Sequence, residues 1–379
     1  MFSLKSSISH YWHRLQARLF PYLETTGLQL TPQMRDLVAI LDLLRVEDCI
    51  SPRRSHQAGA PAKDRAALAR SFIAKHFLNQ PDTKAFRARL FTDETLRRIC
   101  GWNSSQSIPC EATCSRAFAR FADEQLADLL HEPRVKDWLG ETIIWHQALD
   151  ATDISAREAA HPNPEPQYGR TASGKRRKHP VSDRPAGRPK KGEIVEKPLT
   201  RIERQLTQVP EIALLELPTA CDTGSKPDTH QHLHYWVGYK FHVVTNEDGG
   251  PLCAVTTAAS VNDSQVAIPL LHLTARRVTA LYDLLDRGYD AAAIRACSTA
   301  LGHVPIIPEV ARPDNPHPEM VQDRAETYKG RTVAERFNAR LKDEVGGKTV
   351  RVRGVRKVHA HLMFGLLVIF AGMLLNLVK

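Results

Sequence analysis

The sequence lacks the CxxC cysteine spacing that redox centres and many zinc sites use. Cys110 and Cys114 could supply half of a zinc site, but no second pair follows them, so we expect no structural zinc. The cysteines are also odd in number, which argues against a disulfide framework and favours reduced thiols in a cytoplasm. The seven are Cys49, Cys100, Cys110, Cys114, Cys221, Cys253 and Cys297.

Long apolar runs are almost absent as well. Lys5, His10, His13 and Arg14 interrupt any apolar segment near the start, so we expect no secretory signal. One long apolar run remains, at 362–378, and two glycines and an asparagine interrupt it. It is short for a membrane span of about 20 residues. We therefore expect a buried C-terminal helix at 351–379 that packs on the core, and no membrane attachment.

The length of the chain indicates how many domains it has, and its charge indicates what kind of partner it binds. A chain of 379 residues predicts two or more domains. Its 52 Lys and Arg residues exceed its 42 Asp and Glu residues, which gives a formal charge of +10. This balance favours a polyanionic partner such as nucleic acid over an acidic small molecule.

The first part of the chain, residues 1–138, has the apolar spacing of successive helices. Thr31 followed by Pro32 predicts a helix start, because threonine caps helix N-termini and proline fits the first turn. Further helical patterns cover 66–78, 95–100 and 111–130. We expect a helical N-terminal domain.

At Glu141 the pattern changes to β-branched and aromatic residues, which predicts a strand. This strand is expected to end in Asp150 and Thr152, an acid and a hydroxyl. Asp150 is the candidate site residue, Asp153 is the alternative, and a local cap at the strand end is the structural explanation.

Residues 155–234 show no regular pattern, so we expect a basic, flexible insertion there. Such a run cannot bury enough apolar surface to fold alone, and it could bind DNA phosphates nonspecifically or remain a solvated loop. Nine basic residues in it are Arg170, Lys175, Arg176, Arg177, Lys178, Arg184, Arg188, Lys190 and Lys191. Alternating His230, His232 and His234 could suggest a metal site, but a strand start is the favoured interpretation because no Cys or acid nearby completes a shell.

The segment 235–260 reads as an antiparallel hairpin with an acidic, glycine-rich turn. Asp263 is expected to cap the helix that follows it. A second apolar strand then leads into Asp286-Arg-Gly-Tyr-Asp290. Asp286 is the candidate site residue at this strand end; Asp283 and Asp290 are alternatives, and Asp290 is better explained as a helix cap.

Four polar residues further on project to one face of a predicted helix. Tyr328, Arg331, Glu335 and Lys342 lie within about 60° of each other at 100° per residue, and apolar residues follow the opposite side. The structural explanation is a capping box between Thr332 and Glu335 with a solvated basic face.

This four-residue spacing resembles the signature of insertion-sequence transposases of the DDE class, and the Asp286 motif and the Asp150 strand resemble that family's other two motifs. The resemblance implies a mixed α/β fold with an RNase H-like catalytic core formed by 139–154 and 235–350. It also implies that Asp150, Asp286 and Glu335 are catalytic and bind Mg²⁺ or Mn²⁺, with two ions expected.

The resemblance further implies DNA as partner, both the terminal inverted repeats of the element and the target. DNA-binding residues are expected at Tyr328, Arg331, Arg336, Lys342 and Lys348. The helical N-terminal region would recognise the element ends, and a homodimer would act in the synaptic complex, in the nucleoid of a prokaryotic cytoplasm.

The implied reaction is metal-dependent cleavage at the element ends, followed by transfer of the 3′-hydroxyl into target DNA. Two alternatives remain open. One is a catalytically silent DNA-binding protein, and the other is an RNase H-fold nuclease that cuts without strand transfer.

Overall fold

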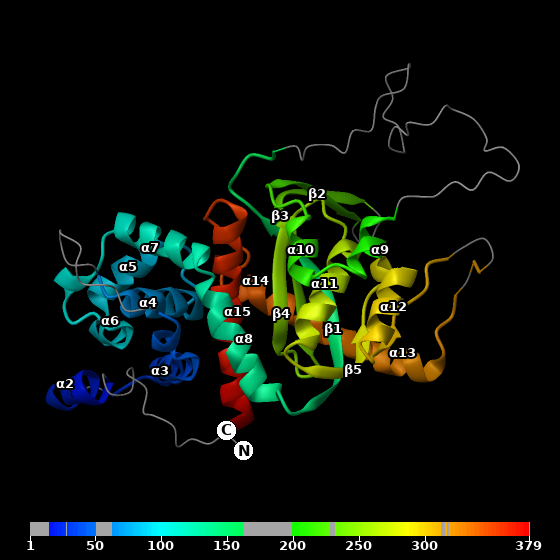
Figure 1. Cartoon of the computed structure of the whole chain (residues 1–379). Coiled ribbons are helices and arrows are strands. Elements are labelled where there is room, and N and C mark those ends of the chain that lie inside the picture. Colours follow the sequence, from blue (N-terminus) through cyan, green and yellow to red (C-terminus); the bar gives the residue numbers. More distant parts are fainter. Residues whose placement is uncertain are drawn as a thin grey trace, which may run out of the picture.

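The computed structural model describes most of the chain, and a long C-terminal helix stands between a group of helices and a mixed sheet (Figure 1). The described residues are 15–27, 29–50, 63–161, 199–227, 232–311, 315–316 and 318–378. The nine basic residues expected in the insertion and His230 lie outside them.

Short helices make up the N-terminal part. They are η1 (Leu15–Leu19), α2 (Phe20–Thr26), α3 (Pro32–Leu44), η2 (Val46–Cys49), α4 (Arg65–Phe77), α5 (Thr83–Thr92), α6 (Glu94–Cys100), η3 (Ser105–Ser107), α7 (Glu111–Asp123) and α8 (Leu126–Leu139). The predicted start of α3 is confirmed, because Thr31 Oγ1 accepts a bond from Met34 N at 3.2 Å. The single helix expected over 111–130 is wrong. Gln125 adopts a left-handed conformation with φ of 52° and separates α7 from α8.

The sheet has the strand order β2-β3-β1-β5-β6, and β4 also pairs with β3. Its strands are β1 (Ile143–Ser155), β2 (Asp222–Pro227), β3 (Leu233–Asn246), β4 (Pro251–Ala258), β5 (Thr279–Leu284) and β6 (Val304–Ile306). β1, β2 and β4 run antiparallel to β3, whereas β1, β5 and β6 are parallel to one another. The predicted hairpin is confirmed as β3 and β4, and the mixed α/β class is compatible with the expected core.

β1 is longer than the sequence predicts. Asp150 does not end it but lies in its middle, because β3 continues to pair with β1 as far as Ser155, opposite Gly238. A Cβ atom at Gly238 would lie 2.0 Å from the carbonyl oxygen of Ile154. Glycine at this position therefore allows the close approach of β1 and β3 beyond Asp150.

The remaining helices flank the sheet and connect its strands. They are α9 (Arg201–Gln205), α10 (Pro210–Leu215), α11 (Ser264–Ala275), η4 (Arg287–Tyr289), α12 (Ala292–Ala300), α13 (Gln322–Tyr328), η5 (Lys329–Arg331), α14 (Thr332–Asp343) and α15 (Val355–Val378). The expectation that 155–234 lacks regular structure is thus wrong for 199–227. There α9 and α10 pack on α11, and β2 extends the sheet. Ala213, Leu217 and Cys221 are buried and anchor this segment.

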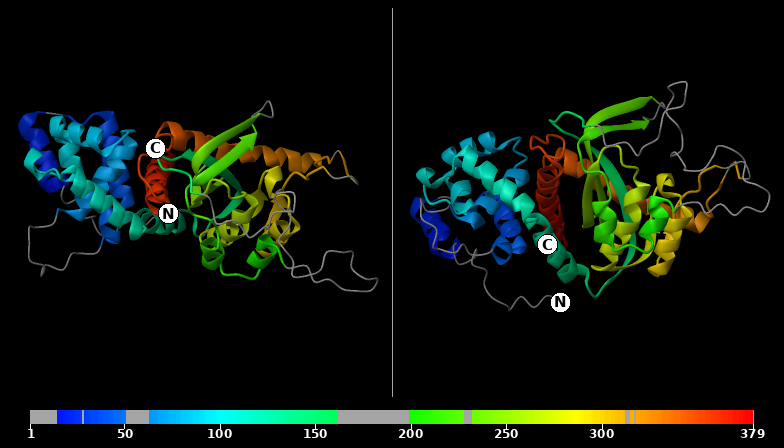
Figure 2. Two further views of the ribbon diagram at one scale, coloured as in Figure 1. Left: turned by 90° about the horizontal axis from the view of Figure 1, so that it is seen from above. Right: turned by 45° about the horizontal axis from the view of Figure 1, so that its top comes forward.

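The C-terminal helix α15 is the central element of the packing. It contacts α3, α4, α7 and α8 on one side and β4 and α14 on the other, and Figure 2 shows it between the two groups in both views. It is long and apolar enough to cross a membrane, but 72% of its most apolar window is buried inside the protein. α15 is therefore a core helix. Both the N-terminal helices and the sheet pack against it, rather than the sheet alone.

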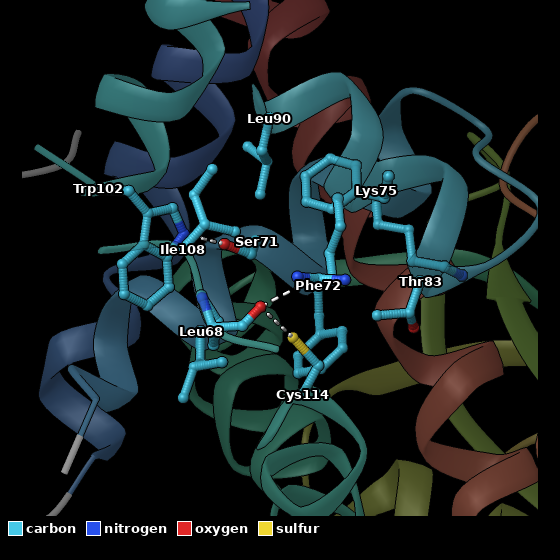
Figure 3. A pocket seen from close by; sticks show the side chains of 12 residues that line it. Leu68, Ser71, Phe72, Lys75, Thr83, Leu90, Trp102, Ile108 and Cys114 are labelled. Atoms are coloured by element: carbon cyan, nitrogen blue, oxygen red, sulfur yellow. Dashed lines mark hydrogen bonds between the residues drawn. The ribbon is translucent and has the colours of Figure 1, made fainter. Parts of the chain in front are cut away.

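Inside the N-terminal helices, a small cavity lies between α4 and the segment that follows α6 (Figure 3). Trp102 closes one side, and its indole Nε1 donates to Ser71 Oγ at 2.9 Å. The cavity volume is about 10 Å³. That is space for about one water molecule, so the cavity is a packing defect and not a ligand site.

Two histidines are buried where α4 meets α15. The rings of His76 and His361 lie 4.4 Å apart, and His361 Nε2 lies 3.0 Å from the carbonyl oxygen of Gly346. Burial lowers the pKa of both, and the nearby charge of Lys75 adds to the effect, so that the pKa of His361 falls to about 3. Both side chains are therefore neutral in the folded protein at neutral pH.

We expect the protein to lose stability as the pH falls below about 6.5. The unfolded chain takes up protons on these histidines near pH 6.5 while the folded chain does not, which costs up to about 1.4 kcal/mol per pH unit for each group. His359 acts in the opposite direction, because Asp128 raises its pKa against the effect of burial. Urea unfolding at pH 7 and pH 5 measures the net change in the free energy of unfolding that results from these opposite effects. His361→Gln should flatten the pH dependence, whereas the exposed His234→Gln should leave it as in the wild type; equal slopes in all three proteins would contradict this account.

Candidate active site

Two of the predicted acids come together on neighbouring parallel strands. Ala148 of β1 pairs with Leu284, the last residue of β5; Asp286 follows two residues later, close enough to Asp150 for its charge to raise the pKa of Asp150. β5 ends at Leu284, so the edge of β1 near Asp150 is open on that side. The site therefore forms where the parallel pairing ends.

The third acid arrives on α14, which packs over the same part of the sheet. α14 and the sheet are joined by an apolar cluster, which is formed by Ala148, Leu284, Ile306, Val333 and Ala334. Just before α14, Gly330 lies against β1, and a Cβ atom there would be 2.6 Å from His146 Nε2. Glycine thus lets the helix start come close enough for its polar face to reach Asp150.

The prediction that one regular helix carries Tyr328, Arg331, Glu335 and Lys342 is wrong. α13 ends at Tyr328, the 3₁₀ turn η5 follows, and α14 begins at Thr332. The capping box considered as the structural explanation does not form. Thr332 Oγ1 donates instead to the carbonyl oxygen of Lys329 at 3.1 Å, and α14 has no side-chain cap. Glu335 is therefore available for another role.

Arg331 joins the first and third acids. Its Nη1 donates to Asp150 Oδ1 at 3.2 Å, and its Nη2 donates to Glu335 Oε1 at 2.5 Å. The side chains of Asp150 and Arg331 are mostly buried, whereas that of Glu335 is 53% exposed. Glu335 can therefore change rotamer more easily than its two partners.

Asn338 is a site residue that we did not predict. Its Nδ2 donates to Asp150 Oδ2 at 2.9 Å, and its side chain is buried. Its Oδ1 is buried and has no hydrogen-bond partner in the described part of the chain. Asn338 lies three residues after Glu335, which places both on one helix face; this spacing was the available signal.

Lys342 pairs with Asp153, the alternative candidate for the first acid. Its Nζ lies 3.0 Å from Asp153 Oδ1. Burial would raise the pKa of Asp153, but the bond and the charge of Lys342 outweigh it and lower that pKa below its ordinary value. Asp153 is thus occupied in an ion pair, next to the site but with a different partner from Asp150.

Asp286 accepts a hydrogen bond from Gly288 N at 2.7 Å, which fixes one of its carboxylate oxygens at the strand end. Its alternative Asp283 is buried elsewhere. Asp283 Oδ1 accepts from Gln147 Nε2 at 2.7 Å and lies 3.0 Å from His303 Nδ1. It belongs to an internal polar network, which leaves Asp286 as the acid beside Asp150.

Two predicted helix caps have other roles. Asp290 does not cap α12; its Oδ1 accepts from Arg295 Nη2 at 2.8 Å and its Oδ2 accepts from Val310 N at 2.9 Å. Asp263 precedes α11 as expected but makes no capping bond. It pairs instead with Lys240 of β3, whose Nζ lies 2.9 Å away. In both cases a cation competes successfully for the carboxylate: Lys240, 23 residues away, for Asp263, and Arg295, five residues away, for Asp290.

The electrostatics of the two strand acids are unusual. Burial raises the pKa of Asp150 above its ordinary value, the charge of Asp286 adds to this, and Arg331 and Asn338 oppose it. Burial also raises the pKa of Asp286. Loss of solvent is thus the larger cause of these raised pKa values, and the nearby charge of Asp286 is a smaller one for Asp150. A bound cation would offset it.

The predicted DNA-binding residues surround this site. Tyr328 packs against the apolar cluster under α14, and burial raises its pKa. Arg336 is exposed on α14, and Lys348 is exposed in the loop that leads to α15. Arg331, Arg336 and Lys342 belong to the same helical segment as Glu335 and make its surroundings positive, whereas Lys348 lies further away, beside the end of β1.

The oxygen donors suit a divalent metal ion, although as they stand no three Asp, Glu, His or Cys side chains in the described ranges are grouped to hold one. The guanidinium of Arg331 already bridges Asp150 and Glu335, so a cation occupies the space between two of the acids. The unpartnered Oδ1 of Asn338 adds a buried acceptor. The donor set fits Mg²⁺ or Mn²⁺ chemically, provided that the bond between Arg331 and Glu335 opens.

Comparison with known families gives two matches. Residues 201–371 match the Transposase DDE domain, and residues 29–120 match the Transposase domain (DUF772). No curated protein and no solved structure matches the chain. The first match begins after β1, so it includes Asp286 and Glu335 but not Asp150. The two matches are independent, lie in order along the chain and both describe transposases, and the chain therefore belongs to the insertion-sequence transposases of the DDE class.

Proposed function

We propose that this transposase has an RNase H-like catalytic core and cleaves phosphodiester bonds at the ends of its insertion sequence. It then joins the released 3′-hydroxyl to target DNA. The catalytic acids in this proposal are Asp150, Asp286 and Glu335, supplied by β1, by the end of β5 and by α14.

One observation carries the proposal. Arg331 of η5 and Asn338 of α14 donate to Asp150 at 3.2 and 2.9 Å, so the helical segment with the family's spacing packs against the strand that carries Asp150. A segment that served only as a solvated surface would not direct two polar side chains to one buried carboxylate.

Transposases of this class generally depend on divalent metal ions. Here Asp150, Asp286 and Glu335 would hold the metal, with two Mg²⁺ or Mn²⁺ ions proposed. Bound there, metal ions would activate the attacking oxygen and stabilise the leaving oxygen of the phosphodiester. Asn338 keeps the Asp150 carboxylate in place, and the partly buried site limits the access of bulk water.

DNA would bind across the basic surroundings of the acids. Arg331 and Lys342 are each held by a carboxylate and can exchange it for a phosphate oxygen, since both partners are anionic. Tyr328, Arg336 and Lys348 extend this surface. The N-terminal helices would recognise the inverted repeats, and a dimer would assemble the two ends in the prokaryotic nucleoid.

The test is cleavage of duplex DNA that carries the element's own ends, in Mg²⁺, Mn²⁺ or EDTA. We expect metal-dependent cutting at the ends by the wild type and its loss in Glu335→Gln. Glu344→Gln is the matched control, because Glu344 is 54% exposed at the end of the same helix and pairs with Arg340.

Other outcomes would favour the alternatives. Equal activity of Glu335→Gln and the wild type would refute the assignment of Glu335. Cutting without joined products would indicate a nuclease that lacks strand transfer. Tight, salt-sensitive binding without any cutting would indicate a silent DNA-binding protein.

A further inference from the structure

A second concave surface lies beyond the acids, between the end of β1 and the loop that joins α14 to α15. We call it the β1 groove; its volume is about 330 Å³. Ser155, Ala156, Arg157, Lys348, Thr349, Val350 and Arg351 line it. Three of these residues are cationic and two carry hydroxyl groups, and among the residues that the structure describes no acidic one lines the groove.

Two of the cations are free to bind a ligand. Arg157 and Lys348 are exposed, and neither forms an ion pair within the described ranges of the chain. Arg351 differs, because its Nη1 lies 3.3 Å from Asp82 Oδ2 on the N-terminal side. Exposed cations without a counter-ion, beside hydroxyl groups in a concave surface, are suited to phosphate oxygens.

The groove continues a line of cations that starts at the acids. Along β1, Arg331 contacts Asp150, Lys342 contacts Asp153, and the groove begins at Ser155. Five residues of an extended strand span about 17 Å. One turn of a duplex rises about 34 Å, so the groove is within about half a turn of the acids and can reach the DNA backbone that flanks the cleaved bond.

We propose that the β1 groove binds a DNA backbone phosphate that flanks the phosphate that is cleaved, within about half a helical turn of it. The inference rests on the proposed function, because it takes the acids as the point of cleavage. Arg157 and Lys348 supply the charge, and Ser155 and Thr349 supply hydroxyl donors. The contact is independent of base sequence and sets the position of the cleaved bond relative to the bound duplex.

The test measures binding of the full-length protein to a duplex that carries the element's end, in EDTA, over a series of salt concentrations. The double variant Arg157→Ala with Lys348→Ala should bind about tenfold more weakly at low salt, and its salt slope should fall by about one to two units. The control removes two exposed cations outside the groove, Lys136→Ala with Arg204→Ala, and should keep the wild-type slope. The charge-conserving variant Arg157→Lys with Lys348→Arg should restore binding.

A neutral methylphosphonate in the DNA locates the contact. Placed in turn at each phosphate within about half a helical turn of the cleavage point, on either strand, it should weaken binding by the wild type at the contacted position but not binding by the double alanine variant. If the double variant keeps the wild-type affinity and slope, or loses no more than the control, the proposal is overturned. Failure of the wild type to cleave in Mn²⁺ would instead count against the proposed function, since the binding measurement involves no cleavage.

Discussion

Replacing Asp150 with asparagine is expected to slow cleavage of the DNA ends by about 10³-fold or more, because electrostatic stabilisation at a reacting phosphate is commonly worth that much. Asparagine has nearly the same shape and can still contact Arg331 and Asn338, but it lacks the charge that holds a metal ion. Single-turnover cleavage in Mg²⁺, with duplex binding measured in EDTA, separates the loss of chemistry from any loss of affinity.

Asp153→Asn is the matched control for this substitution. Asp153 lies three residues further along β1, and its partner is Lys342 at 3.0 Å. Its loss should change cleavage by less than about tenfold, since the ion pair is partly solvated and such pairs contribute about 1 kcal/mol. If Asp153→Asn abolishes cleavage and Asp150→Asn does not, then Asp153 is the first acid and our assignment fails.

Replacing Phe364 with alanine is expected to destabilise the whole protein by about 3–5 kcal/mol, the usual cost of removing a buried phenylalanine. Phe364 is fully buried on α15, and its ring centroid lies 6.0 Å from those of Phe72 and Phe118. The substitution leaves a cavity where α15 meets α4 and α7. Equilibrium unfolding in urea measures the change in the free energy of unfolding.

Phe91→Ala provides the comparison, because Phe91 is 46% exposed and packs only partly. Its free energy of unfolding should differ from that of the wild type by about 1 kcal/mol or less. A wild-type unfolding midpoint for Phe364→Ala would mean that α15 does not hold the N-terminal helices in solution.

Local patterns predicted the elements that have strong periodicity or clear caps. The start of α3 at Thr31 and the hairpin of β3 and β4 were both available from short windows of sequence. The length of β1 was not, because its residues beyond Asp150 are held by pairing with β3, about 90 residues away in the chain. The segment 199–227 escaped prediction for a similar reason, since its helices are of one or two turns and β2 is polar.

The candidate site was predictable to the same extent as the fold: its local patterns could be read from the sequence, but its long-range contacts could not. The spacing of Tyr328, Arg331, Glu335 and Lys342 is local and predicted a shared face. Asp263 pairs with Lys240 of β3, and Asp290 is held by Arg295 of α12 and by Val310 N beyond it, so a short sequence window favoured caps that do not form. Asn338 could have been found by extending the helical projection beyond the four residues of the family's spacing.

The position of α15 has a consequence for how the chain acquires its structure during synthesis. The N-terminal helices leave the ribosome first, yet the apolar surface that covers them lies in α15, at 355–378. They must therefore wait, incompletely packed, until α15 has been synthesised. A chain that stops before α15 would leave apolar surface of both the N-terminal helices and the sheet uncovered, and its premature release would yield material prone to aggregation.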